Sequence, residues 1–153
     1  MKRAVLSLLL ATSAIAADLP STRSLYAALA SAELQWGEHA DVRSVQFADL
    51  GSCVFPGVVA WSDLVTRDIR LNSECRHWDR ESVRVAMLHE YGHMLAGSSV
   101  HSIDRHSVMY RIAIRGQKIR KADREWVLAH EDRPTILIGS KEGGGGSIYF
   151  CME

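Results

Sequence analysis

The chain has 153 residues and carries 18 basic and 18 acidic side chains, so its formal net charge is zero. A chain of this length is typical of one domain and leaves little room for a second. The balanced charge gives no sign of the basic surface that binds nucleic acid or an anionic membrane, so we expect neither as a partner.

The first residues have the features of a secretory signal peptide. Lys2 and Arg3 precede an apolar run that begins at Ala4, and residues 14–16 read Ala-Ile-Ala, the small-residue pattern of a cleavage site. The apolar run is too short to span a membrane comfortably. We therefore predict a signal peptide over residues 1–16 and a mature chain that is secreted or periplasmic.

The spacing of apolar residues predicts the first elements of the domain. Helical spacing over residues 24–36, followed by Gly37 as a natural stop, predicts a helix. Alternating residues predict strands over 42–48 and 66–71, with a turn and a short strand in the segment 51–60 between them.

A longer helix is predicted to begin near Asp79 and to end at Gly97. Asp79 can cap the first turn, and Glu81 favours the positive end of the helix dipole. Gly97 can take the left-handed conformation that often closes a helix. A last helix is predicted over about residues 122–130.

Three cysteines are present, and an exported chain meets oxidising conditions in which disulfides form. Cys53 and Cys75 both lie in the globular part, so we predict a disulfide between them. Cys151 is left over close to the C-terminus. No two cysteines have the C-x-x-C spacing of a zinc site, so we do not expect them to bind metal.

The tail over residues 139–153 differs in character from the rest of the chain. It contains the run GGGGS, which is typical of a flexible linker. Whether this tail is native or was introduced by cloning is left open. If its last residues, IYFCME, act as a tethered peptide, they could reach the cleft of the domain.

The segment HEYGHMLAGSSVH carries the chemistry that the sequence predicts. On a helix, His89 and His93 lie on one face with their Cβ atoms about 5–6 Å apart, so both rings can bind one zinc ion. Glu90 points about 100° away around the helix. That direction suits a general base that accepts a proton from a water held by the ion.

A catalytic zinc ion usually has three protein ligands and one open position. Gly97 lets the chain turn at the end of the helix, and His101 follows four residues later, close enough to be the third ligand. Asp104, His106 and the more distant Glu125 are competitors for this role. The residues alone leave that choice open.

This segment resembles the metzincin metallopeptidases, and within them the matrixin branch. That family carries H-E-x-x-H-x-x-G-x-x-H and then a turn that contains methionine. The matching residues are His89, Glu90, His93, Gly97, His101 and Met109 in the run SVMY. Gly97 comes one residue later and His101 two residues later than in the family pattern, whereas the step from His101 to Met109 is similar to matrixin spacing.

The resemblance implies a small α+β domain over residues 17–138. Its mixed, twisted sheet would have an edge strand along the cleft, with an active-site helix, a methionine turn and a C-terminal helix. Met109 would form a floor beneath the metal ligands. The edge strand would be RDIRLN, and the residues expected to bind substrate are Ile69, Arg70, Leu71, Asn72 and Tyr110.

The function predicted from these residues is that of a secreted, monomeric zinc endopeptidase acting on a peptide or protein. The three histidines would hold one catalytic zinc ion, and Glu90 would be the general base. Two alternatives remain open. One is an exported binding or inhibitory module in which zinc is structural or absent, and the other is a hydrolase of the thermolysin-like clan with Glu125 as third ligand.

Overall fold

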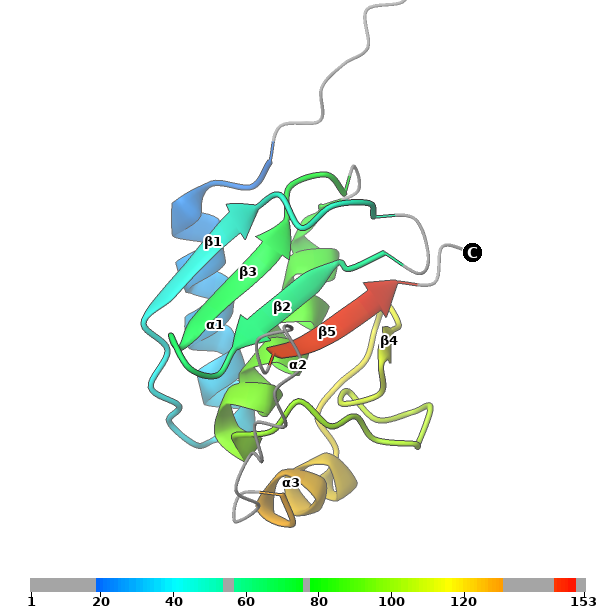
Figure 1. The fold of residues 1–153 in the computed structure, drawn as a ribbon. Helices are drawn as coiled ribbons and strands as arrows, with labels where there is room; N and C mark the ends of the chain where they lie inside the picture. Colours follow the sequence, from blue (N-terminus) through cyan, green and yellow to red (C-terminus); the bar gives the residue numbers. More distant parts are fainter. Residues whose placement is uncertain (1–18, 54–56, 76–77, 131–144, 151–153) are drawn as a thin grey trace, which may run out of the picture.

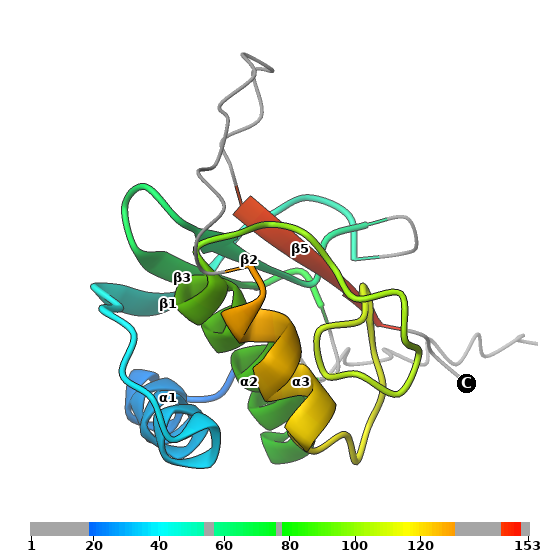
Figure 2. The ribbon, with the colours of Figure 1, turned by 90° about the horizontal axis from the view of Figure 1, so that it is seen from below.

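The computed structural model describes residues 19–53, 57–75, 78–130 and 145–150, and of the last segment only the backbone. Within these ranges a five-stranded sheet lies on one side and three helices lie beneath it (Figures 1 and 2). The predicted α+β class is confirmed. The segment assigned to a signal peptide, residues 1–16, lies outside the described residues.

All three predicted helices are present in the described residues. They are α1 (Thr22–Trp36), α2 (Arg80–Ala96) and α3 (Lys121–Leu128). None of the described helices combines the length and the apolar character that crossing a membrane requires.

The predicted helix ends are confirmed in detail. The Asp79 side chain accepts a hydrogen bond from the backbone N–H of Ser82 and so caps the first turn of α2. Gly37 and Gly97 close α1 and α2 in the left-handed conformation, with φ of 76° and 58°. The turn at Gly97 redirects the chain into the loop that carries His101.

The sheet is mixed, and its strands follow the order β1-β3-β2-β5-β4. The strands are β1 (Ser44–Ala48), β2 (Ala60–Asp63), β3 (Asp68–Asn72), β4 (Ile112–Ala113) and β5 (Gly145–Phe150). β1 runs parallel to β3, β2 runs antiparallel to both β3 and β5, and β4 runs parallel to β5. Strands near the three predicted positions are confirmed, whereas β4 and β5 were not foreseen.

The prediction that RDIRLN forms an edge strand is wrong. In the register of the sheet, Ile69 of β3 lies between Val45 of β1 and Ser62 of β2. Both backbone edges of β3 are therefore paired, and a peptide cannot add to it. The basis for substrate binding by strand addition is thereby lost for the whole set, Ile69, Arg70, Leu71 and Asn72.

Asn72 has a structural role that explains its full burial. Its amide nitrogen donates to the carbonyls of Gly51 and Val58, at 2.9 and 2.7 Å. These bonds fix the segment that leads to the predicted Cys53–Cys75 disulfide, which is confirmed. Asn72 thus holds together the loops at one end of the sheet.

The prediction of a flexible tail needs correction over residues 145–150, because they form β5. Gly146 is paired with Ser62 of β2, and Tyr149 is paired with Ile112 of β4. An unpaired strand edge is a template for any extended segment within reach. β5 covers the edge of β2 that β3 leaves free, which makes these residues part of the sheet.

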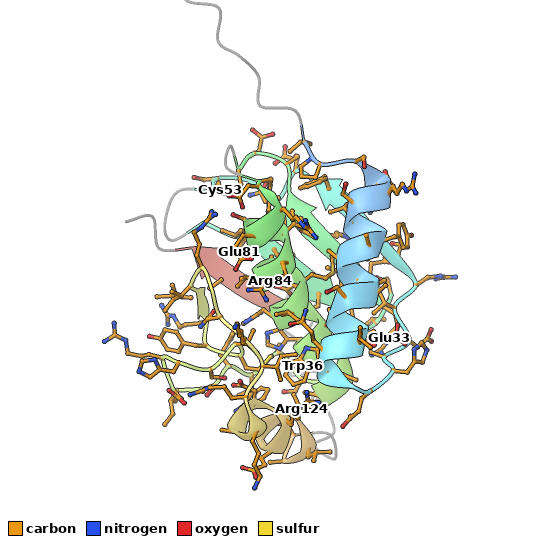
Figure 3. All side chains as sticks on the ribbon, turned by 180° about the vertical axis from the view of Figure 1, so that it is seen from behind. Glu33, Trp36, Cys53, Glu81, Arg84 and Arg124 are labelled. Carbon is orange, nitrogen blue, oxygen red and sulfur yellow. A yellow bond between two sulfur atoms is a disulfide. The ribbon has the colours of Figure 1, made fainter. Side chains whose placement is uncertain are left out.

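The core lies between the sheet and the helices α1 and α2, which pack against each other (Figures 2 and 3). Trp36 and Tyr91 are its largest fully buried side chains, and each such burial contributes about 1.5–3 kcal/mol. Trp36 also donates its indole N–H to the carbonyl of Leu88, at 2.9 Å. Arg124 of α3 donates to the carbonyls of Gln35 and Trp36, and so ties α3 to the end of α1 (Figure 3).

Candidate metal centre

The second half of α2 places two histidines and a glutamate in the interior. His89, Glu90 and His93 are completely buried. The two imidazole rings lie one helical turn apart, with centroids 4.6 Å from each other. The predicted convergence of two rings on one face of the helix is confirmed.

The loop after Gly97 adds a third ring to this pair. The centroid of the His101 ring lies 5.2 Å from that of His89 and 4.9 Å from that of His93. One ligand atom from each of the three side chains can be chosen so that all lie within 4.8 Å of one another. The three histidines are thus close enough to hold a metal ion.

Hydrogen bonds within the loop fix His101 beside the predicted methionine turn. Ser102 donates its backbone N–H to the carbonyl of Met109, at 2.9 Å. Ser107 accepts the backbone N–H groups of Met109 and Tyr110, with its hydroxyl and its carbonyl respectively. The extra residues between Gly97 and His101 are accommodated because this closed loop returns the ring to α2.

The other candidate ligands are engaged or point elsewhere. Asp104 forms an ion pair with Arg120 at 2.7 Å, and Glu125 lies 3.5 Å from the ammonium of Lys121. His106 is exposed. In the described part of the chain, none of these three acidic or histidine side chains joins the histidine cluster.

Backbone carbonyls determine which ring nitrogen of each buried histidine carries the proton. His89 donates its Nδ1–H to the carbonyl of Val108, and His93 donates its Nδ1–H to that of Ser98, both at 2.7 Å. A carbonyl oxygen can only accept, so the proton of each neutral ring sits on Nδ1. The two Nε2 atoms then present lone pairs to each other across 2.9 Å.

Burial keeps these rings in the form that binds metal. Burial, and after it the neighbouring His101 ring, lowers the pKa of His93 to about 3. Burial, and after it the neighbouring His93 ring, likewise holds the pKa of His89 well below its usual value. Both rings are therefore neutral at physiological pH, with their lone pairs available.

Glu90 is a buried carboxyl group without a compensating charge beside it. Burial raises its pKa to about 8, although the nearby Ser62 of β2 opposes this rise. The contact with Ser62 falls short of full hydrogen-bond geometry. Neither carboxyl oxygen of Glu90 nor the Ser62 hydroxyl has such a partner among the described residues. Ser62 was not foreseen, because nothing in the sequence places residue 62 beside residue 90.

A glycine that the sequence motif leaves unspecified allows Met109 to lie under α2. Met109 is completely buried. A Cβ atom added at Gly92 would overlap the Met109 sulfur and would come within 2.9 Å of the Trp36 ring. Gly92 is thus required for this close packing, which places the methionine turn directly against the helix of the histidines.

Tyr110, predicted to bind substrate, is half-buried at the end of the methionine turn. It forms an isolated bridge with Ser102 and lies two residues before β4. Its role toward a substrate stays a prediction.

Comparison with family models, with curated protein sequences and with solved structures finds no match for this chain. The resemblance to metzincins therefore depends on the motif between His89 and Tyr110. What the molecule does has to be inferred from the geometry of the histidine cluster and its surroundings.

Proposed function

We propose that this protein hydrolyses peptide bonds at a zinc ion held by His89, His93 and His101. One observation carries the proposal: the Nε2 lone pairs of His89 and His93 face each other across 2.9 Å in a fully buried position. Two lone pairs repel at this distance, and a cation bound to both removes the repulsion. The geometry is therefore that of a cation site.

The ligand set favours zinc with a catalytic role. Three neutral imidazoles are a common ligand set of catalytic zinc, which keeps a fourth position open. No fourth histidine, cysteine, aspartate or glutamate joins the cluster among the described residues, so nothing there closes the shell as a structural site requires. When bound, zinc would supply a Lewis acid and an acidified water.

Glu90 is the residue that we assign to proton transfer. It follows a ligand histidine directly in α2, and both of its oxygens are free of hydrogen-bond partners in the described part of the chain. A cation in the histidine cluster favours the ionised carboxylate. Glu90 then takes the proton of the attacking water and delivers it to the leaving amine.

The surroundings hold the ligands in place before substrate arrives. The carbonyls of Val108 and Ser98 orient the His89 and His93 rings, which is the usual second partner of a metal-binding histidine. Met109, next to Val108, packs on Gly92 and fixes the methionine turn. The same turn therefore supports the cluster from below and orients one of its ligands.

Secretion or export to the periplasm is part of this proposal. The Cys53–Cys75 disulfide is of the kind that forms and persists in oxidising compartments. The signal-like residues 1–16 predict the same destination.

The test is metal analysis of the purified protein together with a casein-type assay, run with and without a chelator. We expect about one zinc per chain, and hydrolysis that a chelator abolishes and zinc restores. Glu90→Ala should keep the metal and lose activity by roughly 10²–10⁴-fold. Glu74→Ala is the matched control, because Glu74 is an exposed glutamate. Hydrolysis that persists in Glu90→Ala, or a chain that binds no zinc, would refute the proposal.

A further inference from the structure

We propose that β5 occupies the peptide-binding slot of its own domain and thereby competes with other peptides for it. The slot is the space between β2 and β4, and its occupant is the segment Gly145–Phe150 (Figure 1). This inference rests on the proposed function, because it takes the slot to be the place where a substrate lies.

The slot is built to hold an extended chain from both sides. β2 uses one edge for β3 and offers the other edge to β5, which pairs antiparallel with it from Asp63↔Gly145 to Ala60↔Ile148. On its other side, β5 pairs in parallel with β4. Such main-chain pairing is how strand addition binds peptides, and it does not depend on the identity of the side chains.

The slot lies beside the candidate catalytic residues. Ser62 of β2 is next to Glu90, and the residue paired with Ser62 is Gly146 of β5. β4 begins two residues after Tyr110, at the end of the methionine turn. α2 approaches β5 directly, and Figure 2 shows β5 running above this helix. A chain in this slot thus passes the acid–base group and the turn that supports the ligands.

The composition of β5 suits a segment that can leave. Gly145 and Gly146 lie opposite Asp63 and Ser62, so β5 brings no side chain of its own to the position paired with Ser62, the neighbour of Glu90. Glycines weaken a strand because they lose much conformational freedom when they become ordered. β4 contributes only two paired residues. The pairing is therefore one that a better-fitting external peptide can replace.

The extent to which β5 weakens the binding of a free peptide follows from its covalent attachment to the same chain. A segment attached to its own binding site has an effective concentration of the order of 1 mM. If β5 binds its slot with an intrinsic dissociation constant near 0.1 mM, the slot is open in roughly one molecule in ten. The apparent affinity for a free peptide is then about tenfold lower than that of the open slot.

The experiment removes the pairing of β5 in the full chain. Successive backbone N–H groups of a strand point to opposite sides, so the pair Ser147→Pro and Ile148→Pro removes a donor on each side. The pair Lys141→Pro and Glu142→Pro, placed before the strand, is the matched control. Binding of the fluorescein-labelled peptide GGSIYF is measured by anisotropy in the Glu90→Ala background, where no cleavage is expected. In the chain with Glu90 intact, KM and kcat are measured with a casein-derived peptide.

We expect the variant with prolines at 147 and 148 to bind the labelled peptide about tenfold more tightly than the parent and the control. KM should fall by a similar factor while kcat and zinc content stay the same. Unchanged affinity and KM in a zinc-loaded, folded variant, or an equal gain in the control, would overturn the inference. Peptide binding that responds as expected without any hydrolysis would instead refute the proposed function and leave the self-occupied slot standing.

A second measurement on the parent chain does not depend on whether the variant folds. A replaceable strand opens more often than the core of the sheet, so its amide hydrogens exchange faster. We expect the amides of β5 to exchange at least about tenfold faster than those of β3. Equal protection of the two strands would identify β5 as a permanent part of the sheet and overturn the inference.

Discussion

Glu90 and Tyr91 are neighbours on α2, yet they point about 100° apart around the helix and have opposite surroundings. The Tyr91 hydroxyl donates to the carbonyl of Glu38 and accepts the N–H of Ala40, at 3.0 and 2.7 Å. On the same side, Trp36 has a partner for its indole N–H. The Glu90 oxygens have no such partner among the described residues, and the two histidines beside Glu90 direct lone pairs at each other.

The difference shows that one helix serves two purposes. Its side toward α1 follows the rule that buried polar groups are hydrogen-bonded, and so it stabilises the fold. Its other side breaks the rule, and each buried polar group without a partner costs about 1–3 kcal/mol. Such a cost is expected where a ligand supplies the missing partner. Changes on the two sides should therefore have different consequences.

The largest effect on stability is expected from zinc, because the ion would supply the partner that the buried nitrogens of His89 and His93 lack. At a zinc concentration a thousand times the dissociation constant, binding adds about 4 kcal/mol to the free energy of unfolding. Thermal unfolding with zinc and with a chelator should show this difference in the parent and lose it in His93→Ala. His39→Ala is the control, since His39 is exposed and paired with Glu33. Equal stabilisation of His93→Ala by zinc would place the ion elsewhere.

The next effect concerns the residue that we propose as general base: Glu90→Gln should stabilise the metal-free protein. Burial raises the folded-state pKa of Glu90 to about 8, whereas the unfolded group has the usual value near 4.5. Between these values the folded state binds the proton that the unfolded state has released, so stability falls as pH rises. The gain in Glu90→Gln should thus be small at pH 4.5 and reach several kcal/mol above pH 8, since each pKa unit corresponds to about 1.4 kcal/mol.

Urea unfolding of both chains in the presence of a chelator, at pH 4.5 and pH 8.5, measures this gain. Glu74→Gln serves as the control, because the Glu74 side chain is exposed and its carboxyl group is not buried on folding. A Glu90→Gln chain that is less stable than its parent at pH 8.5 would show that Glu90 belongs to the stabilising side after all.

Local patterns in the sequence were sufficient for the helices and for the pair His89 and His93. Asp79 and Gly97 set the ends of α2 through contacts within one turn, and the spacing of His89 and His93 fixes their common face. His101 was favoured as the third histidine by the resemblance to matrixin spacing between His101 and Met109, and not by the residues alone. These features depend on residues close together in the chain, where periodicity and capping are informative.

Contacts between segments that are distant in the chain could not be predicted from local sequence patterns. The alternation in residues 66–71 predicts a strand, but it does not say how many neighbours the strand has, and β3 proved to be central. The carbonyls that orient the histidines have no sequence signal, because every residue has a carbonyl. A run of glycines predicts flexibility, yet its backbone can pair as well as any other when an unpaired edge is within reach.

Gly92 lies between the two sides of α2 and tests whether they are independent. By helix propensity alone, Gly92→Ala should stabilise α2 by about 1 kcal/mol. The added methyl group would instead overlap the Met109 sulfur and crowd the Trp36 ring. We expect a net loss of about 2 kcal/mol, together with weaker zinc binding because Met109 and the Val108 carbonyl that orients His89 move as one turn.

The double variant Gly92→Ala with Met109→Ala supplies the control for this effect. If overlap with Met109 is the cause, the two substitutions together should cost less than the sum of their separate costs. Additive costs, or a Gly92→Ala chain that gains stability as propensity predicts, would show that the methionine turn can shift away from α2 without loss.

The smallest effect is expected on the stabilising side. Tyr91→Phe keeps the ring in the core and removes only the hydroxyl, which leaves the N–H of Ala40 and the carbonyl of Glu38 without this partner. The free energy of unfolding should fall by about 1 kcal/mol, because the neighbouring loop can expose the two groups in part to water. Zinc affinity, measured by competition with a chromogenic chelator, should not change, because no bond of Tyr91 reaches the histidine cluster. A drop in zinc affinity comparable to that of Gly92→Ala would mean that the two sides of α2 are coupled, and that hydrogen bonding beside α1 helps to position the ligands.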